Sequence, residues 1–333
     1  MRLPDRRSYW REAFSLHGSV TPYVMPLVLT FGILATGICS LSWLTEYIIG
    51  HRLALEEAPY EIAGAVLGLL LVFRTNAGYD RWWEGRKLWG GIVNQSRNLV
   101  ISGLAYGPAD LSWRKRFVAW AAVFPHVARN SLRGDAVPAE VAELVGPAGM
   151  REMSQAQHMP NFASMKVALL VREAVERHHM DGFAMMRIDE QRAGLIDHIG
   201  ACERILKTPV PRVYAIKVRQ FITLFLLTLP FALLHRLETD WLIPLITMLV
   251  AYPLVALDQI SIELQNPFNN LNLSPLPLED ISNAITQNLI SLEKQPAGSD
   301  SDLDAALAGG GKWELGKAAI AAAAATAQAS SGI

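Results

Sequence analysis

The sequence predicts an all-α integral membrane protein with four transmembrane helices and a cytosolic helical region. Of its 333 residues, 51% are hydrophobic and only 18% are charged, which is too apolar for an ordinary soluble enzyme and too polar for a bare membrane bundle. No charged side chain occurs from Val20 to Thr45, a stretch long enough to cross about 30 Å of hydrocarbon. The remaining chain has helical periodicity and lacks the sustained alternation typical of strands.

Four membrane spans are expected, at about 20–45, 60–81, 211–235 and 240–262. The uncharged cores of the last three are short, and they cover Ile62–Phe73, Gln220–Leu234 and Trp241–Leu257. An isolated span needs about 20 apolar residues, so these three need protein neighbours or a face in contact with water. Their lengths therefore favour an oligomer or a pore.

The cytosolic helices are expected over about 85–207 and 278–294. Apolar residues recur at helical spacing in this region, for example Val167, Leu170, Val171 and Ala174. Breaks between helices are expected at Gly107-Pro108, Gly134 to Pro138 and Gly146-Pro147. Residues 1–294 are thus expected to form one domain, whereas 295–333, rich in Gly, Ser, Asp and Ala, are expected to form a disordered low-complexity tail.

Basic residues set the expected orientation of the spans. They cluster before the first span and after Phe73, at Arg2, Arg6, Arg7, Arg11, Arg74, Arg81, Arg86, Lys87 and Arg97. The loop between the first two spans is mainly acidic, with Glu46, Glu56, Glu57 and Glu61. Because basic loops stay on the cytoplasmic side, both termini are predicted to be cytoplasmic in a multi-pass protein of the cell membrane.

Several classes of function are excluded by composition and motifs. A formal net charge of −1 gives no basic excess for binding nucleic acid. Cys39 and Cys202 are the only cysteines, too few for a disulfide framework or a thiolate metal cluster within one chain. The His198 and Cys202 pair is more typical of packing than of zinc binding. No catalytic or phosphate-binding motif is present, so we predict neither an enzyme nor a bound cofactor or metal.

The most informative motif joins the second span to a charged stretch, Phe73-Arg74-Thr75-Asn76-Ala77-Gly78-Tyr79-Asp80-Arg81-Trp82-Trp83-Glu84-Gly85-Arg86. A second motif, Asn266-Pro267-Phe268, follows the fourth span. Taken alone, the charges are most simply explained as a solvated or ion-paired helix face, and the tryptophans as packing or interface anchors. The motif residues, for which a structural role is expected, are Arg74, Asn76, Arg81, Trp82, Trp83, Asn266, Pro267 and Phe268.

These motifs resemble those of the bestrophin family, in particular its bacterial members, over roughly residues 10 to 290. The resemblance implies a homopentamer around one axial pore in the bacterial inner membrane. It also implies a hydrophobic neck at Ala65, Leu69 and Phe73 and a cytosolic aperture at Val210. From spacing alone, the neck residues are more simply explained as an apolar stripe facing lipid or the protein core, and Thr208-Pro209-Val210-Pro211 is typical of a helix start.

A calcium site is not expected, although animal bestrophins carry an acidic calcium clasp after the Asn-Pro-Phe motif. Here Asn269, Asn270, Leu271 and Asn272 stand in place of the acidic residues. A calcium ion needs several carboxylate oxygens, which these residues do not supply.

The predicted function is passive conduction of monovalent ions, with chloride or another anion favoured by the resemblance. The expected partners are further copies of the chain, the lipid bilayer and the ions themselves. Two alternatives remain open: a cation-selective channel of the same architecture, and a non-conducting membrane scaffold or sensor. The apolar neck residues carry no charge, so they do not decide between an anion and a cation.

Overall fold

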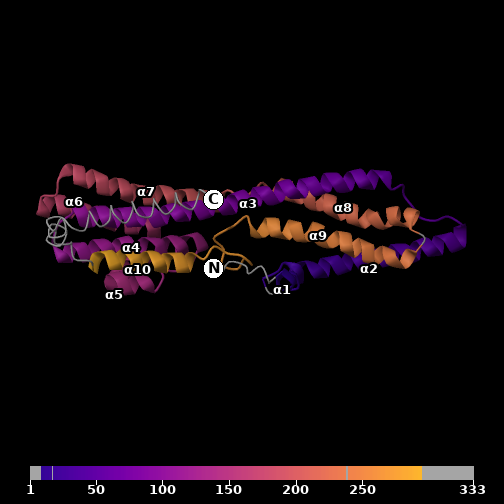
Figure 1. Ribbon diagram of the computed structural model, residues 1–333, viewed down its shortest axis with the longest axis horizontal. Helices are drawn as coiled ribbons and strands as arrows, with labels where there is room; N and C mark the ends of the chain where they lie inside the picture. The colour runs from indigo at the N-terminus through magenta and orange to yellow at the C-terminus, as the bar shows by residue number, and fades with distance from the viewer. Residues whose placement is uncertain (1–8, 17, 238, 295–333) are drawn as a thin grey trace, which may run out of the picture.

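The fold was analysed in a computed structural model that describes residues 9–16, 18–237 and 239–294 (Figure 1). The helices, in chain order, are α1 (Tyr9–Ala13), α2 (Thr21–Ile49), α3 (Ala58–Tyr106), α4 (Leu111–Arg133), α5 (Glu140–Ser154), α6 (Met159–His178), α7 (Gly182–Lys207), α8 (Arg212–Arg236), the 3₁₀ turn η2 (Asp240–Leu242), α9 (Ile243–Glu263) and α10 (Leu278–Lys294). These described ranges contain no strand, so the predicted all-α class is confirmed. The predicted tail, 295–333, lies outside them.

The molecule is elongated and has two helical halves joined by α3 (Figure 1). One half, the span bundle, consists of α2, α8, α9 and the first part of α3, packed around a core that includes Leu67, Leu71 and Leu226. The other half, the distal bundle, consists of α4 to α7, α10 and the rest of α3, and its separate core includes Trp113 and Phe124. Each half therefore buries apolar side chains of its own, and α3 contributes to both.

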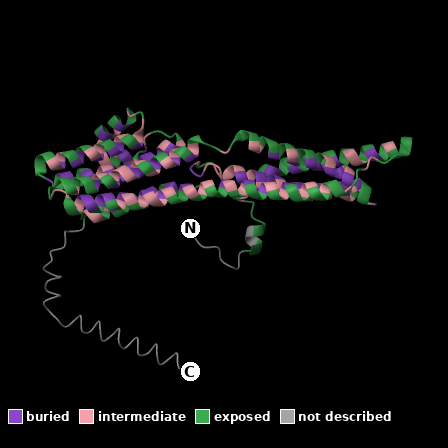
Figure 2. Ribbon diagram, turned by 90° about the horizontal axis from the view of Figure 1, so that it is seen from above, coloured by how far each residue is buried: buried purple, intermediate pink, exposed green. Residues whose placement is uncertain are grey.

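Four helices of the described chain are long and apolar enough to cross a membrane, and all four contribute to the span bundle. They are Thr21–Ile49, Ala58–Tyr106, Arg212–Arg236 and Asp240–Glu263. Much of this half is exposed (Figure 2), and its exposed residues include many large apolar ones, such as Leu249, which is 73% exposed. Exposed apolar surface of this extent is unfavourable in water and suits a bilayer, so the chain is a multi-pass membrane protein.

The second span and the first distal helix form one continuous helix, α3, with no break between the predicted span 60–81 and the cytosolic helices predicted from 85. Two glycines allow close packing along this stretch. A Cβ atom on Gly78 would lie 3.1 Å from the Ser261 carbonyl oxygen, and one on Gly85 would lie 2.8 Å from Cγ of Pro267. These glycines therefore serve close approach by the end of α9 and the loop after it, and they do not interrupt α3.

The predicted chain breaks coincide with helix ends. Helix α3 ends just before Gly107, and α4 ends just before Gly134, which has a φ of 73°. Gly146 has a φ of 76° and kinks α5. A positive φ is easily adopted only by glycine, which explains why the chain turns at the last two positions.

Ion pairs join the connections at the end of the span bundle that is remote from the distal bundle. Arg52, after α2, pairs with Asp240 at the start of η2. Arg236, at the end of α8, pairs with Glu57 at 2.9 Å, next to the start of α3. The acidic α2–α3 connection and the α8–α9 turn therefore lie together, opposite the distal bundle (Figure 1).

A buried histidine links α4 to α10 in the distal bundle. The side chain of His126 is only 1% exposed, and its Nε2 lies 2.8 Å from Oγ1 of Thr286. Its Nδ1 lies 3.7 Å from Oε1 of Glu140. Burial lowers the pKa of His126 below its ordinary value of 6.5; the Glu140 and Glu279 carboxylates oppose this shift and Arg129 adds to it. His126 is therefore neutral in the folded protein at neutral pH.

We expect acidification to destabilise the distal bundle through this histidine. Below about pH 6.5 the unfolded chain takes up a proton on His126 that the folded protein does not, so the free energy of unfolding falls with pH by up to about 1.4 kcal/mol per unit, until the folded pKa is passed. Thermal unfolding between about pH 5 and pH 7 would measure this slope. His126→Gln, which can still bond Thr286, should flatten it, and an identical slope in both proteins would rule out His126 as the cause.

Candidate functional site

The predicted neck residues lie together on an exposed face of α3. Leu69 is 55% exposed and Phe73 57%, and Ala65 is also exposed. Leu67 and Leu71, on the opposite face, are fully buried in the span bundle. The exposed residues that recur every three or four positions on this side, here called the α3 stripe, are Ile62, Ala65, Leu69, Phe73, Asn76, Asp80, Trp83 and Lys87.

The α3 stripe changes character along its length. It is apolar as far as Phe73 and then carries Asn76, Asp80 and Lys87, with Trp83 between the last two. The motif residue Asn76 therefore lies on the same face as the neck residues, one turn closer to the distal bundle. If several copies of α3 surrounded an axis with this face inward, a short apolar constriction would open into a polar passage.

Behind the stripe, three charged side chains from three helices meet inside the span bundle. Arg74 of α3 is 2% exposed and pairs with Oδ1 of Asp258 on α9, which is 10% exposed. Nε of Arg219, on α8, lies 2.9 Å from Oδ2 of the same carboxylate. Nε of Arg74 also donates to Oγ of Ser261 at 3.2 Å. This charge cluster ties α3, α8 and α9 together directly behind Phe73.

Arg81 holds the segment that contains the predicted aperture. Its Nη1 donates to the carbonyl oxygen of Thr208 at 2.8 Å, its Nη2 to that of Ile205, and its Nε to that of Gln265 at 3.1 Å. These carbonyls lie at or just beyond the ends of α7 and α9, where helices leave acceptors without intrahelical partners. Val210 follows in the short link from α7 to α8 and is half-buried. One side chain of α3 thus fixes the start of this link.

Arg81→Ala is expected to loosen the link that carries Val210. Loss of the guanidinium leaves three carbonyls without their donor, at a cost of about 1–3 kcal/mol. Amide hydrogen exchange over residues 205–211 should become at least roughly tenfold faster. Arg86→Ala, which removes an exposed guanidinium from the next turn of α3, is the matched control. Equal exchange rates in the two variants would contradict this role for Arg81.

The tryptophans of the first motif lie where the two halves meet. Trp82 is partly buried against the distal core and stacks on Tyr79 with ring centroids 6.3 Å apart. Trp83 is 46% exposed. In the second motif Phe268 is 1% exposed, and its ring and Pro267 pack against Gly85. Through these contacts the second motif packs against the first, where the span bundle meets the distal bundle.

Asparagine side chains organise the loop after the second motif. Nδ2 of Asn272 donates to the carbonyl oxygens of Asn266, at 2.7 Å, and Glu263, at 2.8 Å. Oδ1 of Asn269 accepts from the backbone N–H of Leu271 at 3.0 Å. Hydrogen bonds from amide groups thus connect this loop to the end of α9. Over the described residues, no group of three or more His, Cys, Asp or Glu side chains is arranged to hold a metal ion.

The sequence pointed to Arg74 and Arg81 but not to their partners. Asp258 and Arg219 lie within the expected spans 240–262 and 211–235, and a charge inside a span is itself a signal of a specific partner. Sequence spacing could not identify that partner, because the three charges lie on different helices. Backbone carbonyl acceptors, such as those of Ile205 and Thr208, leave no signal in the sequence.

Comparison with known proteins places these features in context. A family model described as bacterial/fungal bestrophin protein matches residues 1–291. A voltage-dependent anion channel-forming protein of Nostoc sp. is 30% identical over 86% of this chain and 92% of its own length. One from Escherichia coli K12, YneE, is 30% identical over 89% of this chain and 95% of its own. The crystal structure of a bacterial bestrophin homologue from Klebsiella pneumoniae superimposes with a TM-score of 0.74 at 24% identity, covering 82% of this chain and 99% of that one.

Proposed function

The chain belongs to the bacterial and fungal bestrophin family, and on that premise we propose that it is an anion channel with the α3 stripe lining its pore. The observation that carries the proposal is its similarity to proteins named as anion channel-forming. That similarity extends over 86% and 89% of this chain and nearly the whole of the relatives. Because the match covers 92% and 95% of the relatives' own length, it includes nearly all of the chain that their names describe as channel-forming.

The pore we propose runs along the axis of a homopentamer, the number implied by the resemblance to bestrophins. Ala65, Leu69 and Phe73 form a hydrophobic neck, because their shared face of α3 is exposed in the described chain and can meet the same face of other copies. Beyond the neck the passage widens into a polar cavity and narrows again at Val210. A narrow apolar constriction tends to lose its water, and a dewetted pore does not conduct ions. A small widening lets water return, so it changes conduction strongly. Conduction through it is passive and monovalent.

We also propose that the protein lies in the bacterial inner membrane with both termini in the cytoplasm. The acidic connections at Glu57 and Asp240 are gathered at one end of the span bundle. The distal bundle, at the other end, follows the basic stretch of α3. Under the positive-inside rule the distal bundle is therefore cytosolic. We propose further that conduction needs no bound calcium, since amide groups occupy the place of an acidic clasp.

The experiment that tests this function is the reversal potential of the purified protein in a planar bilayer under a potassium chloride gradient. A reversal near the chloride equilibrium potential is the expected result. A reversal near the potassium potential would retain the pore and overturn the proposed anion selectivity. The absence of current from intact oligomers would instead support a scaffold or sensor. A second recording after addition of a calcium chelator should show unchanged current.

A further inference from the structure

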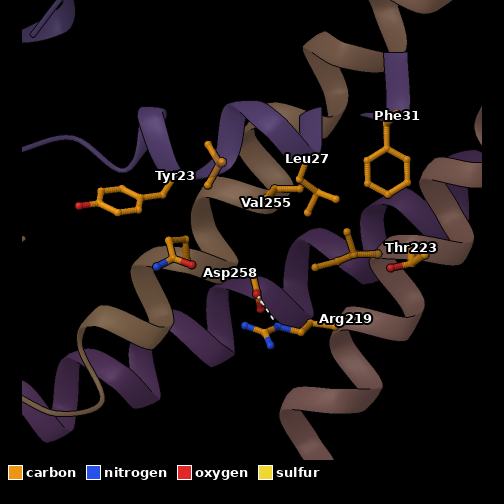
Figure 3. Close-up of a pocket in the computed structure, with 10 residues that line it drawn as sticks. Tyr23, Leu27, Phe31, Arg219, Thr223, Val255 and Asp258 are labelled. Carbon is orange, nitrogen blue, oxygen red and sulfur yellow. Dashed lines mark hydrogen bonds and ion pairs between the residues drawn. The ribbon is translucent and has the colours of Figure 1, made fainter. Parts of the chain in front are cut away.

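A cavity on the side of the span bundle combines a polar end with a mainly apolar wall. It measures about 290 Å³, and its walls come from α2, α8 and α9 (Figure 3). Tyr23, Gln259, Asp258 and Arg219 form one end. Away from that end the walls continue with residues that are apolar except for Thr223, namely Val24, Leu27, Phe31, Ile222, Thr223 and Val255. Since α2 and α8 run away from the distal bundle, the polar end faces the distal bundle and the apolar end faces the middle of the spans (Figures 1 and 3).

The charges at the polar end favour an anion. Asp258 forms ion pairs with two guanidinium groups: Arg74 contacts its Oδ1 and Arg219 contacts its Oδ2. Within the described chain, the hydrogen bond of Arg219 uses Nε alone, one of five N–H donors on a guanidinium. Its side chain is 55% exposed and borders the cavity (Figure 3). Arg219 therefore presents unused donors and a positive charge at the head of an apolar groove.

Glu263, the next carboxylate along α9 after Asp258, is already engaged. Oε1 of Glu263 accepts from Nε2 of Gln259 at 3.3 Å, and Oε2 accepts from the backbone N–H of Leu273 at 3.0 Å. Both Glu263 oxygens are thus directed to groups of α9 and the following loop. Among the ion pairs of the described chain, Arg74 and Arg219 share the single carboxylate of Asp258, so these three side chains carry a net charge of +1.

We propose that this cavity binds one phospholipid with an anionic headgroup. Its phosphate accepts hydrogen bonds from Arg219, and one acyl chain lies along Leu27 and Phe31. A planar guanidinium matches phosphate oxygens in bidentate geometry, and a cation near a membrane surface is drawn to anionic lipid. If the distal bundle is cytosolic, as proposed above, the lipid belongs to the cytoplasmic leaflet. The binding itself does not depend on that orientation or on ion selectivity.

The test is native mass spectrometry of the detergent-purified oligomer, titrated with phosphatidylglycerol and, separately, with phosphatidylcholine. Both lipids carry the phosphate, but the quaternary ammonium of phosphatidylcholine cancels its charge, so wild type should bind phosphatidylglycerol at least roughly fivefold more tightly. Arg219→Gln should remove that preference while keeping the Arg74–Asp258 pair. Arg236→Gln, which removes an exposed arginine from the far end of the same helix, is the matched control.

A second variant and a competitor separate the lipid from a simple anion. Leu27→Trp fills the apolar part of the cavity and leaves Arg219 in place, so it should also weaken phosphatidylglycerol binding. Millimolar glycerol phosphate should compete poorly, because it lacks acyl chains. Unchanged lipid preference in Arg219→Gln, or full competition by glycerol phosphate, would overturn the proposal. The assay reads binding to intact oligomers, so it can succeed even if the protein proves not to conduct.

Discussion

Replacing Asp258 with alanine is expected to destabilise the protein by about 3–5 kcal/mol, the largest effect on stability that we predict from a single substitution. The carboxylate is 10% exposed and neutralises Arg74, which is 2% exposed, as well as bonding Arg219. Without it, two guanidinium groups face each other in the span bundle, and the buried one has no counter-charge. Removing one member of a buried pair costs far more than the pair contributes in total, because the remaining charge stays buried.

Thermal unfolding of the purified oligomer in detergent would measure this loss. Glu57→Ala is the matched control, because it breaks the exposed pair with Arg236 at the other end of the same bundle. An exposed pair contributes only about 0–1 kcal/mol. Replacing Arg74 with methionine and Asp258 with leucine together should recover much of the stability lost by Asp258→Ala. If Asp258→Ala were no more destabilising than Glu57→Ala, the cluster would be of little importance to the fold.

Truncating the proposed neck is expected to increase the single-channel conductance at least several-fold, the largest effect on function that we predict. Phe73→Ala removes an aromatic ring, and Leu69→Ala a branched side chain, from a face that is more than half exposed at both positions. In an apolar constriction, extra width admits water and lowers the barrier to ions; each reduction of about 1.4 kcal/mol raises a rate tenfold. The chain should still fold, since neither side chain contributes to the buried core of the span bundle, and size-exclusion chromatography of each variant would check that the oligomer persists.

Single-channel recording of the two variants would test the neck directly. Leu249→Ala is the matched control: Leu249 lies on α9, is 73% exposed and belongs to another membrane-spanning helix. If the α3 stripe faces the pore, Leu69→Ala changes conductance and Leu249→Ala does not. If the stripe faces lipid, the two substitutions behave alike, and the neck must be sought elsewhere.

The helices and their ends could be predicted from the sequence because the relevant signals are local. Uncharged runs marked the four spans, and glycines at 107, 134 and 146 marked breaks that the structure confirms. The continuity of α3 was not foreseen, because the second span and the cytosolic helices were predicted as separate segments, 60–81 and 85–207. Gly78 and Gly85 are explained only by the atoms of Ser261 and Pro267 that pack against them.

The candidate site, too, could be predicted from the sequence only in part. Ala65, Leu69 and Phe73 could be grouped from helical spacing, and the structure adds that their shared face is exposed in the single chain. The place proposed for them around a shared axis depends on contacts between copies, which one sequence does not encode in any local pattern. Arg81 could be chosen as a motif residue, whereas its three carbonyl partners could not, since backbone acceptors are present at every position.

By itself the sequence determined the family, the all-α class and the membrane spans, because hydrophobic runs, helix periodicity and motif identity are properties of short segments. The packing of the helices, by contrast, places buried Arg74 and Asp258 in one cluster with the half-exposed Arg219, which also borders the cavity between α2, α8 and α9. The physical reason is that a buried charge is stable only beside its counter-charge. Which charges become neighbours depends on how α3, α8 and α9 pack, and not on their separation along the chain.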